Sequence, residues 1–380
     1  MIYLDHQATT PIDPAVLAEM THVSEHYFGN PGSPHRAGVE AFQLVDAARG
    51  AIARFLGARK SEIYFTSGAT EANNLAIKGV ATERRGHVVT TAVEHKSVLS
   101  GCAFLGAKGY DVTVLPVDGE GRVSPQLVAE SLRADTILVS VMLANNEVPT
   151  IQPIAEISEV TRRAGVPLHC DATQGIAYVD VDVDELGVDL LSLSGHKLYG
   201  PKGVGVLYVS DALTDKMDLT PLCHGGGQER GLRAGTLNTA GIVGLGAAVR
   251  LVAEHREEES RRLAGLRAVF LDELSRSVDF ELNSGTGSGF LPHAVNLSLT
   301  GVDAQLLLPY LTDVAISTGS ACDSASEKPS HVLTALGLSP ERIKGSIRLS
   351  VGRFTERDEV VRAAQLLAAT GHDLQQRTAV

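Results

Sequence analysis

The sequence predicts an α/β protein whose largely parallel sheet is covered by helices on both faces, followed by a smaller α+β domain. Three observations support this. Six short apolar, β-rich runs alternate with helical stretches between residues 62 and 210. One long helical stretch then covers residues 240–275, and beyond it two runs, 293–299 and 346–351, alternate with period 2. We expect a large domain over residues 16–255 and a small domain formed by residues 1–15 and 256–380.

The elements follow in order along the chain. Residues 41–56 predict a core-facing helix, because Phe42, Val45, Ile52, Phe55 and Leu56 share one face before the stop at Gly57. The six strands are expected within residues 62–68, 87–93, 136–142, 166–171, 188–194 and 204–210.

Helix punctuation separates these strands. Ser124 with Pro125 opens one helix, and Pro153 opens another that closes at Gly165. The stretch 240–275 is apolar in its first part and charged in its second, which is typical of a connector between two cores. Shorter helices are expected at about 303–311, 329–336 and 358–369.

Composition excludes several classes of function. The formal net charge of −12 argues against direct binding of nucleic acid or an anionic membrane. No apolar run reaches the ~18 residues of a membrane span, and the start MIYLDHQATTP lacks signal-peptide character, so we expect a cytoplasmic protein. Phosphate-loop, dinucleotide and HExxH metal motifs are missing from the sequence, and no metal site is predicted.

Four cysteines are widely separated, which argues against a zinc site and against a disulfide framework. Cys102 and Cys170 adjoin apolar residues and are expected to be buried. Cys223 precedes a run of glycines, and its burial and role stay open. Cys322 lies in the Gly/Ser-rich segment STGSACDSASEKPS, which is typical of a loop and would suit a nucleophile that visits one site and delivers to another.

Polar residues follow four of the predicted strands, at the sheet edge where ligands bind in open α/β folds. The turn SGAT at 67–70 leads into a helix and could hold a phosphate on backbone N–H groups, although a simple helix cap is the better explanation of this turn taken alone. Lys197 follows a buried run and could form a Schiff base, and Asp171 ends another run and could hold a pyridinium nitrogen. Each alone could instead be a snorkelling lysine or a helix cap.

Arg348 lies on the face of strand 346–351 opposite Ile347 and Leu349. Its guanidinium could bind a substrate carboxylate with two hydrogen bonds. A solvated sheet face is the alternative.

Along nearly its whole length the chain resembles the cysteine desulfurases of the NifS/IscS type, which belong to the class V aminotransferases. The motifs that carry the resemblance are YLDHQATTP (3–11), FGNPGSPHRAG (28–38), FTSGATEANNLAIKG (65–79), VEHKSVL (93–99), VSVMLANNEVPTIQPI (139–154), HCDATQ (169–174), SLSGHKLYGPKGVG (192–205), HGGGQERGLRAGT (224–236), STGSACDSAS (317–326) and SIRLSVGRFT (346–355).

The resemblance implies the fold type I of enzymes that depend on pyridoxal 5'-phosphate (PLP). It implies that Lys197 holds PLP as a Schiff base, that Asp171 pairs with the ring nitrogen, and that His95 stacks on the ring and shuttles protons. The remaining cofactor contacts that it implies are Gln174 and Asn146 near the ring oxygen, and Ala69, Thr70, Ser194, His196 and the neighbouring subunit's copy of Thr236 at the phosphate.

For the substrate, L-cysteine, the resemblance implies a carboxylate clamp made by Arg348 with help from Asn30, and a contact with Asn146. Cys322 would accept the sulfur as a persulfide and leave L-alanine. A homodimer and a sulfur-acceptor protein are expected partners. The long segment after Cys322 matches the group with a mobile cysteine arm, but the chain ends at LQQRTAV without the tail that docks some acceptors.

The sulfur's destination therefore stays open among iron–sulfur cluster assembly, tRNA thiolation and DNA phosphorothioation. A selenocysteine lyase or another PLP-dependent branch is the alternative enzyme. A sulfur-pathway scaffold with a dead site is the alternative without catalysis, and the presence of Lys197, Asp171, His95 and Cys322 argues against it.

Overall fold

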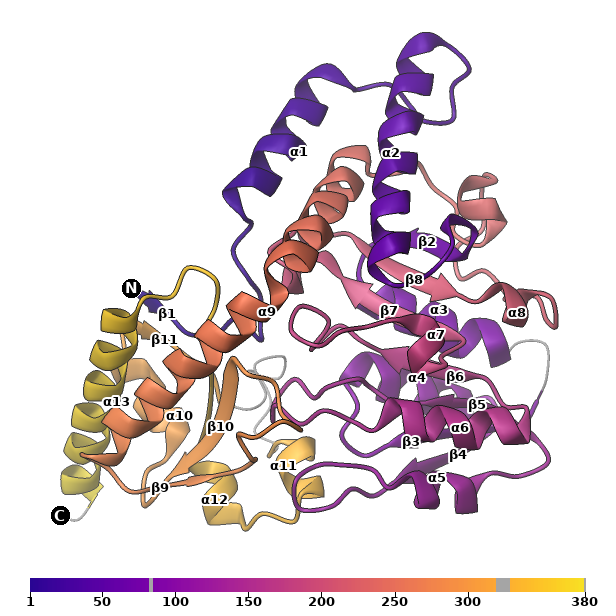
Figure 1. The fold of residues 1–380 in the computed structure, drawn as a ribbon. Helices are drawn as coiled ribbons and strands as arrows, with labels where there is room; N and C mark the ends of the chain where they lie inside the picture. Colours follow the sequence, from indigo (N-terminus) through magenta and orange to yellow (C-terminus); the bar gives the residue numbers. More distant parts are fainter. Residues whose placement is uncertain (82–84, 319–328, 379–380) are drawn as a thin grey trace.

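The computed structural model describes residues 1–81, 85–318 and 329–378. Its main feature is a seven-stranded sheet with the order β2-β8-β7-β6-β5-β3-β4 (Figure 1). β8 is antiparallel to both neighbours and the other strands are mutually parallel, which confirms the predicted fold class. The strands are β2 (Ile63–Thr66), β3 (His87–Thr91), β4 (Asp111–Leu115), β5 (Thr136–Ser140), β6 (Leu168–Asp171), β7 (Leu190–Ser194) and β8 (Gly205–Val209).

All six predicted strands of this sheet are present, but sequence analysis missed β4. Its sequence, DVTVL, has no continuous apolar run because β4 is an edge strand whose first residues are exposed or half-buried. Continuous apolar runs mark strands that are covered on both faces, so they reveal the central strands and the buried edge strand β2 but not β4.

Helices cover both faces of the sheet, because neighbouring residues of a strand point to opposite sides. Val88 and Leu190 join a core with α3 (Ala69–Ala81) and α4 (Lys96–Ala107). Val89 and Leu191 join the opposite core with α2 (Arg36–Phe55), α6 (Ile154–Ala164) and the first half of α9 (Thr239–Ser275). Shorter helices are α5 (Pro125–Ser131), α7 (Val183–Leu186) and α8 (Asp211–Thr214).

The long helix α9 connects two hydrophobic cores, as its change from apolar to charged sequence predicts (Figure 1). Its residues Ile242 to Val252 pack in the core of the large sheet, and Leu263 to Leu274 pack in a second core. α13 (Arg357–Thr378) lies beside this second half. The exact domain boundaries near residues 15 and 255 stay a prediction.

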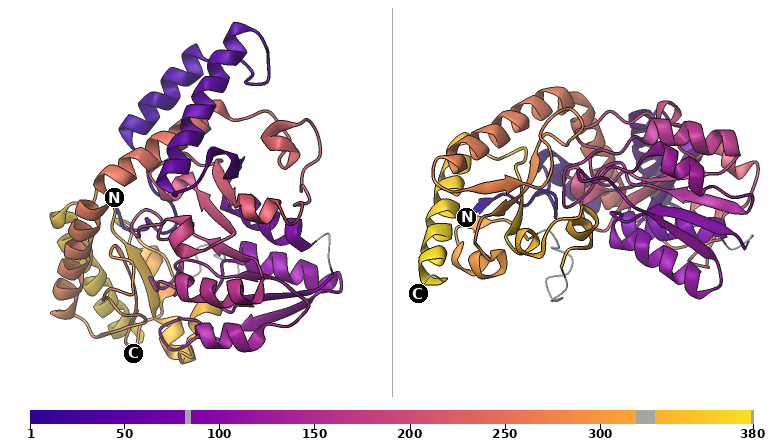
Figure 2. Two further views of the ribbon diagram at one scale, coloured as in Figure 1. Left: turned by 45° about the vertical axis from the view of Figure 1, so that its right-hand side comes forward. Right: turned by 90° about the horizontal axis from the view of Figure 1, so that it is seen from below.

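The second core contains an antiparallel sheet with the order β12-β10-β9, and the N-terminal strand β1 pairs with β11 (Figure 2). Residues 1–5 therefore lie with the C-terminal part of the chain. The helices and strands in residues 1–5 and in the C-terminal part of the chain are β1 (Ile2–Tyr3), β9 (Phe280–Leu282), β10 (Ala294–Leu299), α10 (Ala304–Leu307), β11 (Val314–Ala315), α11 (His331–Ala335), α12 (Pro340–Lys344) and β12 (Ser346–Ser350).

α1 (Pro14–His26) and α2 form a hairpin that projects from the body of the molecule (Figures 1 and 2). The prediction that Phe42 faces the core is wrong, since its side chain is 54% exposed. Phe42 belongs to the outer half of α2, while Val45 and Ile52 further along the same helix are buried. No helix in the described part of the chain is long and apolar enough to cross a membrane.

A candidate cofactor and substrate pocket

A cavity of about 540 Å³ opens at the carboxyl ends of β2, β6 and β7, where sequence analysis expected a ligand. Ten of the predicted site residues line it, from strands and loops far apart in the sequence. They are Ala69, Thr70, His95, Asn146, Asp171, Gln174, Ser194, His196, Lys197 and Arg348. Their convergence in one cavity argues against separate structural roles such as caps or snorkelling side chains.

One end of the cavity is built to hold an anion. β2 turns through Ser67 and Gly68 into the first turn of α3, whose backbone N–H groups face outward from the helix start. Gly68 has φ +145° and lies against β8, where a Cβ atom on Gly205 would come within 2.6 Å of the Gly68 Cα. Position 205 therefore requires glycine for this close approach of β8 to the turn. Ser194 lies next to the same turn.

His196 lies beside the same turn and is neutral at physiological pH. Burial lowers its pKa to about 4. Its Nδ1 lies 3.1 Å from the Thr9 hydroxyl, so the imidazole is fixed in orientation. The neutral, oriented imidazole of His196 and the Ser194 hydroxyl could hydrogen-bond an anion together with the backbone N–H groups of α3.

The amine of Lys197 points to the N-terminal segment of the chain. The short helix η2 (Gly195–Lys197) directly follows β7, and the Lys197 Nζ donates to the carbonyl oxygens of Gln7 and Ala8, the latter at 2.8 Å. Gln174 also donates to the Gln7 carbonyl, at 2.9 Å. The segment YLDHQATTP therefore positions the amine inside the cavity.

Asp171 and His95 are joined by a buried hydrogen-bonded chain that sequence analysis missed. The Asn73 amide donates to the Asp171 carboxylate at 2.7 Å and to the Ser97 hydroxyl at 2.8 Å. The Ser97 hydroxyl in turn lies 2.7 Å from His95 Nδ1. Asn73 is fully buried within an otherwise apolar face of α3, and that polar exception is the signal that could have revealed it.

His95 is held as a neutral imidazole with a defined tautomer. Burial lowers its pKa, although the nearby Asp171 opposes this effect. The backbone N–H of Ser97 donates to His95 Nδ1 at 3.1 Å, so Nδ1 is an acceptor and the ring proton sits on Nε2. His95 therefore presents an N–H to the cavity while it caps α4.

Glu94, next to His95, is a buried carboxyl group. Burial raises its pKa to about 8, so it is mostly protonated at neutral pH. One of its oxygens accepts hydrogen bonds from Thr91 and from the Met142 backbone, and the other has no partner among the described residues. The His331 ring of α11 donates to the Glu94 carbonyl at 3.0 Å and so ties α11 to the loop that carries His95.

The raised pKa of Glu94 gives a testable pH dependence. Between pH 4.5 and 8 the Glu94 carboxyl binds a proton in the folded state but not in the unfolded state, so its contribution to stability is complete below pH 4.5 and is lost as pH rises through 8. Glu94→Gln is expected to reduce the loss of unfolding free energy between pH 5 and 9 by on the order of 3 kcal/mol. Chemical denaturation at both pH values measures it. An equal change of unfolding free energy with pH in the wild type and the variant would contradict the raised pKa of Glu94.

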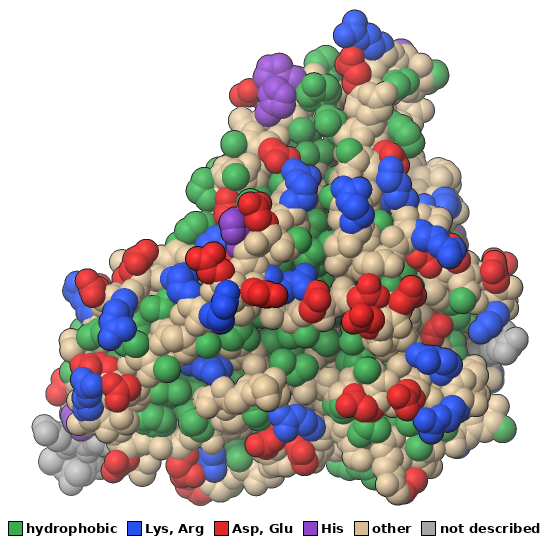
Figure 3. Space-filling model, in the orientation of Figure 1, with side chains coloured by type: hydrophobic (Ala, Val, Ile, Leu, Met, Phe, Trp, Pro, Cys, Tyr) green, Lys and Arg blue, Asp and Glu red, His purple; other side chains and the backbone are tan. Residues whose placement is uncertain are grey.

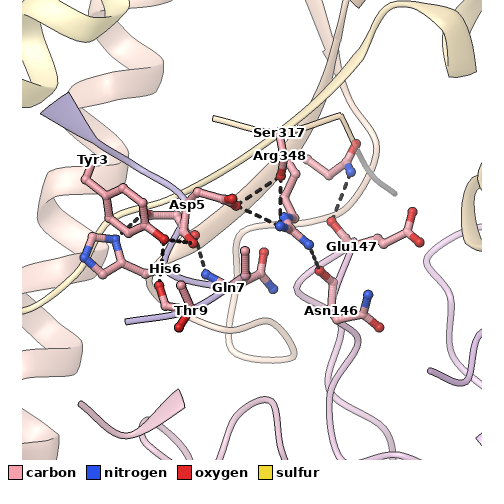
Figure 4. A network of polar contacts seen from close by, with 12 residues as sticks. Tyr3, Asp5, His6, Gln7, Thr9, Asn146, Glu147, Ser317 and Arg348 are labelled. Atoms are coloured by element: carbon pink, nitrogen blue, oxygen red, sulfur yellow. Dashed lines mark hydrogen bonds and ion pairs between the residues drawn. The ribbon is translucent and has the colours of Figure 1, made fainter. Parts of the chain in front are cut away.

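Arg348 is buried on β12 and reaches the cavity from the second core (Figure 4). Its Nη1 donates to the Asn146 carbonyl at 2.6 Å, and its Nη2 donates to Asp5 at 2.7 Å and to the Ser317 hydroxyl at 2.8 Å. The alternative of a solvated sheet face is therefore wrong. Arg348 Nε and the Asn146 side-chain oxygen are buried without a partner among the described residues, which suits a polar ligand at this end.

Two predicted residues lie elsewhere. Asn30 and Thr236 line a second cavity of about 270 Å³ between the loop that joins α1 to α2 and the start of α9, and neither lines the cavity of Lys197 in the same chain. The expected role of Asn30 beside Arg348 therefore has no support within the single chain, whereas Thr236 is expected at the neighbouring subunit's site.

The cysteines divide as predicted where they are described. Cys102 and Cys170 are buried, and burial raises the pKa of the Cys102 thiol to about 12, whereas Cys223 is exposed. Cys322 lies outside the described residues. The residues that flank its segment are fixed near the cavity, since Ser317 contacts Arg348 and the Ser330 hydroxyl donates to the Glu147 carboxylate.

The residues that line the cavity of Lys197 fit PLP. The helix start with Ser194 and His196 suits its phosphate, Lys197 suits its aldehyde, and Asp171 suits its ring nitrogen. Within residues 1–81, 85–318 and 329–378, no cluster of three His, Cys, Asp or Glu side chains could hold a metal ion.

Comparisons with known proteins agree with this architecture. Residues 2–362 match the family model for aminotransferase class-V. The chain is 46% identical to a cysteine desulfurase IscS of Azotobacter vinelandii over 96% of this chain and 91% of that protein. A solved NifS-like protein superposes with a TM-score of 0.90 at 35% identity, covering 97% of this chain and 98% of the other. A structure of SspA in complex with cysteine gives a TM-score of 0.84 at 42% identity, with 94% and 100% covered. The chain therefore belongs to the class V aminotransferase family.

Proposed function

We propose that this protein is a PLP-dependent L-cysteine desulfurase that transfers sulfur to Cys322 and releases L-alanine. The observation that carries the proposal is the convergence of Lys197, Asp171, His95 and Arg348 on one cavity. An amine, a carboxylate, a neutral imidazole and a guanidinium are the groups needed to hold PLP and the carboxylate of an amino acid. The names of the relatives, which include cysteine desulfurases, support cysteine as the substrate.

The residues at the two ends of the cavity bind and orient the cofactor and the substrate. The start of α3, Ser194 and His196 hold the phosphate, and Arg348 holds the substrate carboxylate. PLP, when bound, withdraws electrons from the substrate carbon atoms and so weakens the bond between Cβ and sulfur. Asp171, fixed by Asn73, keeps a negative charge at the place where the ring nitrogen needs a proton.

Two residues move protons. With its Nζ free, Lys197 would take the proton from the substrate Cα and return it later in the cycle. His95 carries its ring proton on Nε2, so it can donate a hydrogen bond into the cavity and would give that proton to a substrate thiolate. The chain through Ser97 and Asn73 keeps its ring in this tautomer.

Sulfur transfer then balances without an added oxidant. The Cys322 thiolate attacks the substrate sulfur, a sulfur–sulfur bond forms, and the Cβ–sulfur bond breaks with its electron pair left on Cβ, which is protonated. The products are a Cys322 persulfide and alanine. A sulfur-acceptor protein takes the outer sulfur, and its identity stays a prediction, as does the cytoplasmic location.

The direct test is turnover of L-cysteine by the PLP-loaded protein in the presence of a thiol reductant. We expect sulfide and alanine in equal amounts. The alternative, a selenocysteine lyase, is tested by the ratio of kcat/KM for L-selenocysteine and L-cysteine. Turnover of selenocysteine with no alanine formed from cysteine would contradict a desulfurase.

We also propose that the protein acts as a homodimer. Asn30 and Thr236 share a cavity that is separate from the one containing Lys197, which supports the expected contact of Thr236 with the partner's cofactor. Next to them, Phe28 is 84% exposed and Phe42 is 54% exposed on the projecting hairpin. Figure 3 shows hydrophobic side chains along this hairpin. A second copy that covers the hairpin would bury these rings and bring Thr236 to the partner's phosphate site.

Phe42→Glu is expected to weaken the dimer by at least about tenfold, because it places a charge in a surface that would lose its water. Sedimentation velocity at several concentrations measures the dissociation constant. Leu306→Glu is the matched control, since Leu306 on α10 is 53% exposed and lies in the part of the chain around the second core. Equal effects of the two variants on assembly, or none, would argue against the hairpin as the interface.

A further inference from the structure

The buried ion pair between Arg348 and Asp5 has a consequence for ligand affinity. We propose that Asp5 is the resident counter-ion of Arg348, that it orients the guanidinium, and that it competes with the carboxylate of the bound amino acid. Asp5 is thus a positioning residue that sets how tightly amino acids are held. The inference rests on the proposed role of Arg348 in carboxylate binding.

The geometry fixes Asp5 firmly on the guanidinium. Arg348 Nη2 lies 2.7 Å from Asp5 Oδ1, and the side chains are 3% and 17% exposed. Ser317 completes a triangle, because its hydroxyl donates to the same Asp5 oxygen at 3.0 Å and accepts from Nη2 at 2.8 Å. Figure 4 shows this triangle between the N-terminal strand and β12.

The backbone holds Asp5 in place as well. Asp5 forms a β-bridge with Ser350, two residues after Arg348, and Ser317 forms a bridge with Arg348 itself. Tyr3 donates to the Asp5 carbonyl at 3.1 Å and to the Thr9 carbonyl at 2.8 Å. The carboxylate of Asp5 therefore cannot swing away freely when another carboxylate arrives.

The electrostatic consequence has a definite sign. In the free protein the one positive charge of Arg348 is already neutralised by Asp5. An incoming ligand carboxylate must either share the guanidinium with Asp5, against like-charge repulsion in a poorly solvated site, or displace it. Both routes weaken binding. A partly neutralised arginine would also favour release of the product alanine, which keeps the carboxylate.

Asp5→Asn separates charge from geometry, because the amide oxygen can still accept hydrogen bonds from Nη2 and Ser317. We expect this variant to bind L-alanine about tenfold more tightly than the wild type, a change of ~1.4 kcal/mol. Ethylamine is alanine without its carboxylate, and its affinity is expected to stay unchanged. Isothermal titration calorimetry of the PLP-loaded proteins with each ligand measures both constants without requiring turnover.

Ser317→Ala tests orientation with the charge retained, and we expect weaker alanine binding, by about threefold, with ethylamine again unchanged. Asp13→Asn is the matched control for loss of a buried charge. Asp13 pairs with Arg353 at 2.9 Å, with the side chains 13% and 14% exposed, and it neither lines the cavity nor contacts Arg348. This control should leave both affinities unchanged.

Unchanged or weaker alanine binding by Asp5→Asn, with wild-type preference for alanine over ethylamine intact, would overturn the inference alone. Equal tightening for alanine and ethylamine would also overturn it, because the effect would not depend on the carboxylate. A wild type that does not prefer alanine to ethylamine would instead reject Arg348 as the carboxylate site, and the inference would fall with the proposed function.

Discussion

Replacing Lys197 by alanine is expected to abolish covalent attachment of PLP and to lower the rate of alanine formation from L-cysteine by at least about a thousandfold, since general acid–base catalysis alone contributes about 10²–10⁴. The expectation rests on the position of Lys197, whose Nζ is directed to the Gln7 and Ala8 carbonyls inside the cavity. The absorbance of the bound cofactor and the retention of PLP after denaturation measure attachment, and a coupled alanine assay measures rate.

Lys197→Arg is the companion variant, because it keeps a long cationic side chain but cannot form a Schiff base under these conditions. We expect it to be as inactive as Lys197→Ala while it keeps PLP bound through the phosphate. Activity within tenfold of wild type in either variant would show that another amine holds the cofactor and would contradict the assignment of the cavity.

Cys322→Ala is expected to leave the cofactor absorbance unchanged and to reduce sulfide release from L-cysteine by at least about a hundredfold, because the reaction loses its nucleophile. Cofactor binding should survive, since every residue proposed to hold PLP lies outside the segment of Cys322. Methylene blue detection of sulfide and the absorbance spectrum of the purified variant give the two readouts.

Cys223→Ala is the matched control, since Cys223 is the exposed thiol among the cysteines in the described ranges. Its turnover should equal that of the wild type. Wild-type sulfide release by Cys322→Ala would reject a persulfide on this residue and favour a lyase that frees sulfur directly, whereas loss in Cys223→Ala alone would move the nucleophile to the other thiol.

The parts of the fold that sequence analysis predicted are those dictated by local pattern. Strands buried on both faces, such as β7, appear as unbroken apolar runs. Pro125 marks the start of α5, and Gly165 caps the end of α6. The failures concern residues whose surroundings are set by distant segments. β4 lies at an exposed edge, and Phe42 lies on a helix that leaves the body of the molecule, although its spacing is that of a core residue.

The same distinction applies to the site. Residues at strand ends, such as Asp171 and Lys197, could be predicted because parallel strands bring their carboxyl ends to one edge. The partners of Asn73 and Asp5 could not, because they lie 98 and 343 positions away in the sequence. Only the folded chain joins Asn73 to Asp171, or sets Asp5 against Arg348.

The central claim is that sulfur from L-cysteine is carried on Cys322, and mass spectrometry of the enzyme after a single turnover tests it most directly. PLP-loaded protein is mixed with substoichiometric L-cysteine without reductant, alkylated and digested. One added sulfur atom is expected on the peptide that contains Cys322, in an amount equal to the alanine released. Alanine formed in full while the Cys322 peptide keeps its unmodified mass would contradict it.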